Sequence, residues 1–265
     1  MTSAQIPSPV LDGAFGLSDH SYIFLIGGGG KTTLMFALAH SLMDSGHTVV
    51  STTTTKILRP PAEEVSCVIV EKNVDRAASL LRKELSAARH ITLGKTQVRI
   101  SGKLHGYAAE ELDGLWREKI ADYMIVEADG SAGKSLKAHA AHEPVISGKA
   151  DLVIAVIGSD CIGCPLDDAH VHRAERFGRL IGKAPGTPLS ADDVATIFFH
   201  PLGYLKAFPP TADVIVLISK VADDVRRSNA ERLAAALKAA DCTWRISRIV
   251  IGELAGATPF LEARG

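Results

Sequence analysis

The feature that most constrains this chain is an apolar run that leads into four glycines and then into Lys-Thr-Thr. The apolar run is residues 22–26, the glycines are Gly27 to Gly30, and Lys31, Thr32 and Thr33 follow. Because glycine has no Cβ, the backbone turns sharply there and brings its N–H groups close to an anion. A strand, a glycine-rich turn and a helix in this order are typical of a phosphate-binding loop. The loop lysine then lies over the phosphates, and the next hydroxyl binds Mg²⁺.

The loop is shorter than the usual pattern G-x-x-x-x-G-K-[ST], which would place its first glycine at Leu25. The first glycine present is Gly27, so the loop is two residues short. The alternative is a glycine-rich turn that merely links a strand to a helix. Each glycine costs conformational entropy on folding, and a plain turn needs only one or two. We therefore predict that nucleotide phosphates bind to Gly27, Gly28, Gly29, Gly30, Lys31, Thr32 and Thr33.

A run of threonines follows the second short apolar stretch, residues 48–50. Residues 52–55 are all threonine, and Lys56 comes next. β-Propensity explains one or two of these threonines, but ligands of parallel sheets bind at the carboxyl ends of the strands. We therefore expect Thr53, Thr54 and Lys56 to contact the nucleotide, with Thr54 among the Mg²⁺ ligands.

Another apolar stretch, Tyr123–Val126, ends on two acids, Glu127 and Asp129. An apolar strand that delivers a carboxylate at its end is typical of nucleotide-hydrolysing enzymes, where the carboxylate holds Mg²⁺ or positions water. The alternative is an acid in an Asp-Gly turn, which accounts for Asp129 but not for Glu127 inside the strand pattern. A buried carboxylate needs a metal, a cationic partner or several hydrogen bonds. We predict that both acids take part in metal binding and catalysis.

Strands and helices alternate along the rest of the chain. After a lead-in over residues 1–20, this alternation predicts one α/β domain over residues 1–265, with a mostly parallel sheet covered by helices on both faces. Further strands are expected at 65–70, 90–93, 151–158, 214–218 and 245–251. Helices are expected from Lys31 to a stop at Gly46 and at 74–88, 108–119, 170–181, 190–199 and 231–240.

Charge and apolar patterning exclude several classes of partner. The net charge of −1 gives no electrostatic reason to expect nucleic acid or an anionic membrane. No apolar run approaches the roughly 20 residues of a membrane helix, and the N-terminus lacks the pattern of a signal peptide. Four cysteines are too few for a disulfide scaffold, so we expect reduced thiols and a cytoplasmic protein. Cys161 and Cys164 precede a His-x-His pair, but the spacing does not suit structural zinc, and their role stays open.

Three stretches together resemble the YqeC family, described as accessory proteins of selenium-dependent molybdenum hydroxylases or as selenium cofactor biosynthesis proteins. The stretches are IGGGGKTTLMFALA, STTTTKI, and VEADGSAGKSLKAHAAHEPVI with HVHRAERF behind it. This resemblance covers nearly the whole chain, from about residue 22 to about residue 251. It implies a P-loop NTPase-like domain and a role in maturing a molybdenum hydroxylase or its cofactor. It does not imply a particular reaction.

The resemblance also assigns residues to the site. It implies that residues 27–33 form the phosphate loop and that residues 52–56 and the acids Glu127 and Asp129 complete it. His142-Glu143-Pro144 and His172-Arg173 match further family segments.

Two looser resemblances concern the chemistry and the nucleotide. The short loop and the Glu-Ala-Asp pair are similar to Mur ligases, in which a strand-end glutamate helps hold Mg²⁺ while a carboxylate is activated as an acyl phosphate. Ser219-Lys220 resembles the Asn-Lys-x-Asp guanine-reading segment of GTPases, with serine for asparagine and the acid displaced to Asp223. Lys220 is therefore a candidate nucleotide contact, and both ATP and GTP stay open.

Three functions follow from these patterns. The first is an Mg²⁺-dependent NTPase in which Lys31, Glu127, Asp129 and Arg173 are catalytic, with Lys56 or Lys134 as alternative cations for the transferred charge. The second is a ligase or kinase whose small acidic or selenium-containing acceptor contacts His142, Glu143 and His172. The third is a nucleotide-gated chaperone that binds a cofactor without hydrolysis. The sequence leaves the oligomeric state open.

Overall fold

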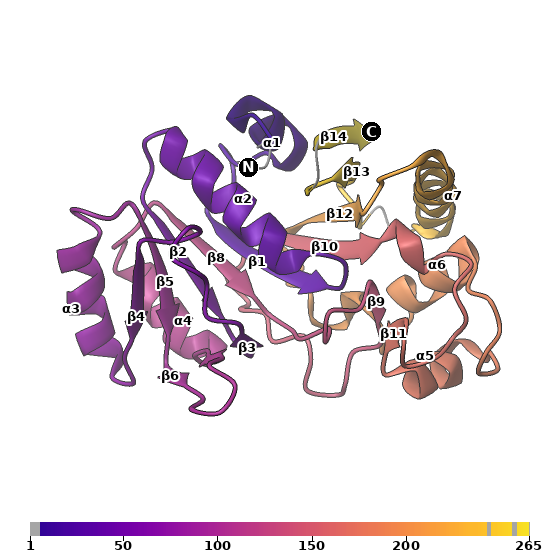
Figure 1. Ribbon diagram of the computed structural model, residues 1–265, viewed down its shortest axis with the longest axis horizontal. Helices are drawn as coiled ribbons and strands as arrows, with labels where there is room; N and C mark the ends of the chain where they lie inside the picture. Colours follow the sequence, from indigo (N-terminus) through magenta and orange to yellow (C-terminus); the bar gives the residue numbers. More distant parts are fainter. Residues whose placement is uncertain (1–5, 243–244, 256–258, 265) are drawn as a thin grey trace.

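The computed structural model describes residues 6–242, 245–255 and 259–264, and its centre is a nine-stranded sheet (Figure 1). The strand order is β14-β13-β12-β10-β1-β8-β2-β5-β4. Among the described strands of this sheet, only the edge strand β14 is paired antiparallel. In chain order the strands are β1 (Tyr22–Gly27), β2 (Val49–Thr53), β4 (Cys67–Val70), β5 (His90–Gly94), β8 (Tyr123–Glu127), β10 (Leu152–Gly158), β12 (Asp213–Ser219), β13 (Arg248–Glu253) and β14 (Phe260–Arg264).

Helices cover both faces of this sheet (Figure 1). One core contains residues of α1 (Ser8–Phe15) and α2 (Lys31–Asp44). The other core contains residues of α3 (Val74–Glu84), α4 (Ala109–Arg117), α5 (Ala174–Ile181), α6 (Ala191–Phe199) and α7 (Asp224–Ala240). Side chains alternate across a strand, so β1 sends Ile23 and Leu25 into the first core and Phe24 and Ile26 into the second. The predicted α/β fold with a mostly parallel, doubly covered sheet is confirmed.

Two small sheets lie beside the carboxyl ends of the large one. One pairs β9 (Leu136–Lys137) with β11 (Val171–His172), and the other joins β3 (Lys56–Ile57), β7 (Leu104–His105) and β6 (Thr96–Gln97). The prediction of a helix from His170 was therefore wrong at its start. Residues 171–172 pair with β9, and Arg173, with a φ of 63°, separates this strand from α5.

Two C-terminal elements also differ from the prediction. Helix α7 begins at Asp224 rather than at residue 231, because the side chain of Asp223 caps it by accepting from the Arg226 amide. Strand β14 was not predicted, and it pairs antiparallel with β13 at the edge of the sheet. None of the helices within the described residues is long and apolar enough to cross a membrane.

Candidate functional site

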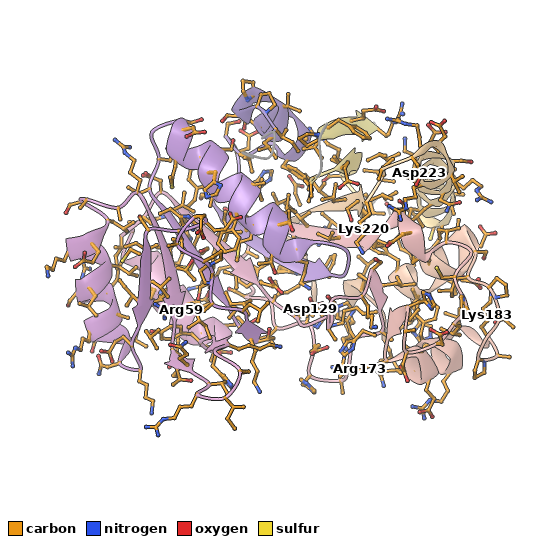
Figure 2. The ribbon with its side chains drawn as sticks, viewed as in Figure 1. Arg59, Asp129, Arg173, Lys183, Lys220 and Asp223 are labelled. Carbon is orange, nitrogen blue, oxygen red and sulfur yellow. The ribbon has the colours of Figure 1, made fainter. Side chains whose placement is uncertain are left out.

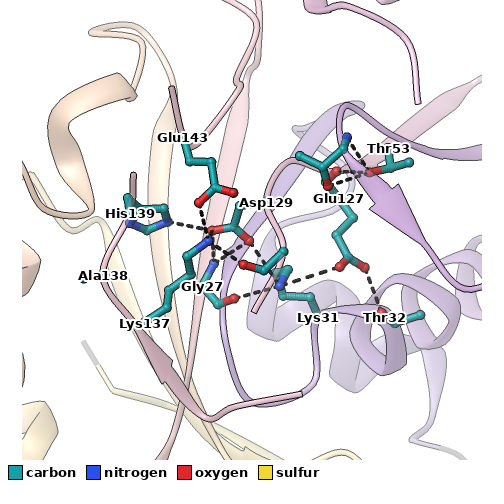
Figure 3. A network of polar contacts seen from close by, with 12 residues as sticks. Gly27, Lys31, Thr32, Thr53, Glu127, Asp129, Lys137, Ala138, His139 and Glu143 are labelled. Atoms are coloured by element: carbon teal, nitrogen blue, oxygen red, sulfur yellow. Dashed lines mark hydrogen bonds and ion pairs between the residues drawn. The ribbon is translucent and has the colours of Figure 1, made fainter. Parts of the chain in front are cut away.

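The candidate site lies where β1 turns into α2, at the carboxyl end of a strand in the middle of the sheet (Figure 1). Figure 3 shows its polar contacts. β1 lies between β8 and β10, and both neighbours run parallel to it. The loop from Gly27 to Gly30 therefore adjoins Glu127, the last residue of β8. The sheet order brings together the loop and the acid that the sequence placed about a hundred residues apart.

The amides of Gly28 and Gly29 already donate hydrogen bonds to neighbouring backbone. The Gly28 amide donates to Val156 O at 2.9 Å, and the Gly29 amide donates to Lys134 O at 3.0 Å. No acceptor within the described residues receives the amides of Lys31, Thr32 and Thr33, which form the first turn of α2. These amides and the positive end of the helix dipole are available to an anion.

The loop lysine is folded into the protein. Lys31 is 3% exposed, and its Nζ donates to Gly27 O at 2.7 Å. The same nitrogen lies 3.1 Å from Asp129 Oδ1 and 3.6 Å from Glu127 Oε1. Burial lowers the pKa of Lys31, but the charges of Asp129 and Glu127 outweigh it and hold the pKa above its ordinary value. Lys31 is thus a buried cation.

Thr32 and Glu127 form a direct pair of oxygen atoms. Thr32 Oγ1 donates to Glu127 Oε2 at 2.8 Å. Burial raises the pKa of Glu127, and Lys31 and Thr32 only partly offset this effect. A hydroxyl and a carboxylate are hard oxygen ligands of the kind that Mg²⁺ takes beside phosphate oxygens and water. The donor set of these two residues therefore fits Mg²⁺, and a cation there would offset the cost of burying the carboxylate.

Asp129 contacts both the backbone and the lysine of the loop. It is fully buried, and its carboxylate accepts from the Gly27 amide at 2.9 and 3.1 Å. Lys31 is bound to one oxygen, while His139 Nε2 at 2.6 Å and Lys137 Nζ at 3.2 Å contact the other. Burial raises the pKa of Asp129, but Lys31, His139 and Lys137 hold it well below its usual range. With four donor groups around it, Asp129 is placed to position the loop.

The threonine run ties β2 to the end of β8. Thr53 Oγ1 donates to Glu127 O at 2.7 Å, and the Thr54 amide donates to the same oxygen at 3.1 Å. The Thr54 hydroxyl, predicted as an Mg²⁺ ligand, donates to Val145 O at 3.0 Å. Lys56 is exposed in β3 and has no polar contact with the loop within the described residues. The structure therefore brings together Lys31, Thr32 and Glu127, whereas the Thr54 hydroxyl contacts Val145 O and Lys56 makes no polar contact with the loop within the described residues.

Arg173 and Lys220, both labelled in Figure 2, have carboxylate partners of their own. The guanidinium of Arg173 binds both oxygens of Glu143, at 2.7 and 3.1 Å. Lys220 Nζ donates to Ser135 Oγ at 2.6 Å and lies 3.1 Å from Asp160 Oδ2. The residue before it, Ser219, does reach the loop, because its hydroxyl donates to Gly29 O at 2.6 Å.

The sequence prediction missed the two basic residues beneath the loop, Lys137 and His139. Both side chains are completely buried. Burial lowers the pKa of His139, and the nearby Asp129 only partly offsets this. The His139 ring packs edge-on against Tyr204, with 4.6 Å between ring centroids. Two basic residues at alternate positions after an acidic strand end were the available signal, since alternate residues of an extended segment share a side.

Comparison with known proteins places these residues in a family. The family described as YqeC protein matches residues 23–175, which include the loop, the threonine run, both acids and Arg173. A protein of Escherichia coli (strain K12), titled uncharacterized protein YqeC, is 34% identical over 187 residues, which cover 71% of each chain.

A solved structure of the signal recognition particle 54 kDa protein from Aeropyrum pernix K1, in complex with GDP, is also similar. The TM-score is 0.39 and the identity is 17%, and the match covers 93% of this chain and 44% of that chain. On the family match and the Escherichia coli relative, the chain belongs to the YqeC family.

Proposed function

We propose that this protein binds a nucleoside triphosphate as its Mg²⁺ complex at the start of α2 and hydrolyses it. The observation that carries the proposal is the 2.8 Å hydrogen bond between Thr32 Oγ1 and Glu127 Oε2. In P-loop NTPases the hydroxyl after the loop lysine and the acid of a nearby strand hold the Mg²⁺ ion. Here the same two groups already touch, next to Lys31.

Each group has a distinct role in this proposal. The free amides of the first turn of α2 receive the phosphates, and Thr32 and Glu127 hold the cation. Lys31 exchanges Gly27 O and Asp129 for phosphate oxygens when the nucleotide enters. Asp129 stays in place through Lys137, His139 and the Gly27 amide. The bound cation supplies charge neutralisation for the transferred phosphoryl group.

The resemblance to accessory proteins of selenium-dependent molybdenum hydroxylases supports a finer proposal. The nucleotide-dependent step serves the maturation of such a hydroxylase or of its cofactor. The nucleotide is ATP or GTP. Asp223, the acid that the GTPase resemblance singled out, is exposed and caps α7.

Nucleotide binding by matched variants tests the proposal. Titration of Mg-ATP and Mg-GTP into the wild type, Lys31→Ala and Thr32→Val should give about tenfold or greater losses of affinity in both variants, because each loses a charge-assisted contact or a metal ligand. Lys83→Ala is the control, since Lys83 is an exposed residue of α3. Equal affinity of Lys31→Ala and wild type for both nucleotides would overturn the proposal.

A turnover assay separates hydrolysis from the other two functions. Slow release of inorganic phosphate from wild type with nucleotide alone supports the NTPase. Release of nucleoside diphosphate only with an added carboxylic acid or selenium compound supports a ligase or kinase. Tight binding without turnover supports a nucleotide-gated chaperone. Loss of turnover in Thr32→Val links any activity to the proposed Mg²⁺ ligands.

A further inference from the structure

Three basic side chains converge on three consecutive carbonyl oxygens, those of residues 138–140. Arg173 Nη1 donates to the first at 3.1 Å, Arg176 Nε donates to the second at 2.7 Å, and Lys206 Nζ donates to the third. Arg173 directly precedes α5, Arg176 lies in the first turn of α5, and Lys206 comes from the short helix Leu205–Ala207. The positive charges of Arg173 and Arg176 act on Lys206, so the three cations lie near enough to interact.

The three cations differ in how their charges are balanced. Arg173 binds the Glu143 carboxylate through both of its terminal nitrogens. Throughout residues 6–242 and the other described segments, neither Arg176 nor Lys206 forms an ion pair with a carboxylate. Each is partly buried and, within these described segments, donates through only one of its N–H groups. The two side chains thus offer several unused donors and two unpaired charges.

The pKa of Lys206 is consistent with an excess of positive charge around it. Burial lowers its pKa, and the neighbouring positive charges of Arg176, Lys137 and Arg173 lower it further. The nearby Glu143 acts in the opposite direction but does not outweigh them. An anion bound between Arg176 and Lys206 would remove the repulsion. An arginine fork with a lysine point charge suits the oxygen atoms of a phosphate or carboxylate group.

The cluster is linked to the phosphate loop by the segment that it holds. A Cβ at Gly28 would lie 2.4 Å from Lys134 O and 3.0 Å from the Leu136 amide, so this segment packs directly on the loop. Residue 140 is four positions beyond Leu136, which limits the separation to about 14 Å. Between them, His139 contacts Asp129, which holds Lys31. A group bound at the cluster is therefore near the candidate nucleotide site.

We propose that Arg176 and Lys206 form an anion site for a phosphate or carboxylate group of a second, small-molecule ligand. This site is separate from the phosphate loop, and its existence does not depend on nucleotide binding. Glu143 binds Arg173, and Lys137 binds both Glu143 and Asp129. These contacts hold Arg173 in place beside the anion site.

Titration of inorganic phosphate and, separately, of citrate into the full-length protein tests the site. Arg176→Gln and Lys206→Gln should each weaken binding of the preferred anion about tenfold or more, because each removes a charge-assisted contact. Arg179→Gln is the matched control, one turn along α5, where Arg179 is exposed and pairs with Glu175. It should bind as the wild type does. Comparison of the two titrations identifies phosphate or carboxylate as the recognised group.

Two outcomes would overturn the anion site. One is equal affinity of Arg176→Gln, Lys206→Gln and Arg179→Gln, which would place all binding at the phosphate loop. The other is a wild type that binds neither anion. If Arg176→Gln proves unstable, Arg176→Lys keeps the charge and should bind with intermediate affinity. A Mg-nucleotide titration of the wild type reports on the proposed function separately, since its failure leaves the comparison of anion affinities intact.

Discussion

Lys31 Nζ lies 3.1 Å from Asp129 Oδ1 in the interior of the protein, where the lysine is 3% exposed and the aspartate 0%. The lysine that the sequence assigns to phosphate is thus already paired with a carboxylate. Asp129 also receives Lys137, His139 and the Gly27 amide. A single acid therefore fixes both the backbone of the loop and its lysine. In the proposed function, entry of a nucleotide would exchange a partner of Lys31 and leave the other contacts of Asp129 in place.

Replacing Asp129 with asparagine should lower the free energy of unfolding by about 3–5 kcal/mol, the usual cost of removing one partner from a buried ion pair. The pKa of Asp129 is depressed, so its contribution is present at neutral pH. The effect should shrink below about pH 4, where the carboxyl group protonates in the unfolded chain. Urea denaturation at pH 7 and at pH 3.5 measures both values.

Glu63→Gln is the control for Asp129→Asn, because Glu63 is an exposed acid with no polar contact within the described residues. Its effect on unfolding should be within about 0.5 kcal/mol of zero. An equal, small effect of both variants would contradict the role of Asp129 as the support of the loop.

Glu127→Gln should affect stability and function in opposite directions. The pKa of Glu127 is raised by burial, so the ionised form is disfavoured in the folded protein. Stability from this group is present below its unfolded pKa and is lost as pH rises through the folded pKa. The glutamine variant should therefore be at least as stable as wild type at pH 7, and the difference should vanish in acid. Affinity for Mg-nucleotide should fall about tenfold or more, because the proposed Mg²⁺ site would lose its charged ligand.

The readouts for Glu127→Gln are thermal unfolding and a nucleotide titration at several Mg²⁺ concentrations. The wild type should bind more tightly as Mg²⁺ rises, and the variant should respond little. A variant that keeps the full Mg²⁺ response would exclude Glu127 as a ligand. The Thr32 contact is retained in this variant through the amide oxygen, so a loss reflects charge rather than packing.

The sequence was sufficient to predict the strand, loop and helix around Lys31, because an apolar run, glycines and a helical period occur in immediate succession. The position of Glu127 at a strand end and the family resemblance also indicated that this acid belongs to the site of the loop. The structure supplies the reason for that proximity: β8 is the direct neighbour of β1.

The residues that surround Asp129 could not be predicted from the sequence, for a physical reason. Lys137 belongs to β9, a strand of two residues, and such a short element carries no periodic signal. The start of α5 was misplaced because the pairing of β11 with β9 is a tertiary contact, which no local pattern shows. The contacts of the threonines could not be predicted either, because their hydrogen-bond acceptors are distant in sequence. The Thr54 hydroxyl, for example, donates to Val145 O.

His90 should make the protein less stable as the pH falls. The ring is 2% exposed, and burial, aided by the nearby His40, lowers its pKa to about 4. As the pH falls, His90 takes up a proton near pH 6.5 in the unfolded chain but only near pH 4 in the folded protein. The free energy of unfolding is therefore unaffected by this residue above about pH 6.5 and decreases as the pH falls toward about 4. The loss is about 3–4 kcal/mol, from ~2.5 pKa units at ~1.4 kcal/mol each.

Denaturation midpoints at half-unit steps of pH from about 7 to about 4 test the assignment to His90. His90→Gln keeps a polar group beside Ser51 Oγ, which His90 Nε2 contacts at 2.9 Å, and should flatten the slope. His142→Gln, at an exposed position, should not. A slope for His90→Gln equal to that of wild type would assign the acid sensitivity elsewhere, with the buried His139 as the next residue to replace.

Gly28→Ala should destabilise the loop, although alanine is the smallest side chain that can be added. Its Cβ would lie 2.4 Å from Lys134 O and 2.8 Å from the Ser135 carbonyl carbon, both of them backbone atoms. Backbone cannot rotate away as a flexible side chain does, so the loop or the segment beneath it must move. We expect a loss of about 1–3 kcal/mol, as for other overpacked sites, together with weaker nucleotide binding.

Gly114→Ala makes the same chemical change with the opposite expected sign. Gly114 lies inside α4, and a Cβ there would meet no atom within 4 Å. Alanine in a helix is favoured over glycine by about 0.5–1 kcal/mol, because glycine loses more conformational entropy on folding. Chemical denaturation should therefore move the midpoint down for Gly28→Ala and up for Gly114→Ala. A rise in both midpoints would mean that the segment after Lys134 yields easily, and the close contact would then not explain why residue 28 is a glycine.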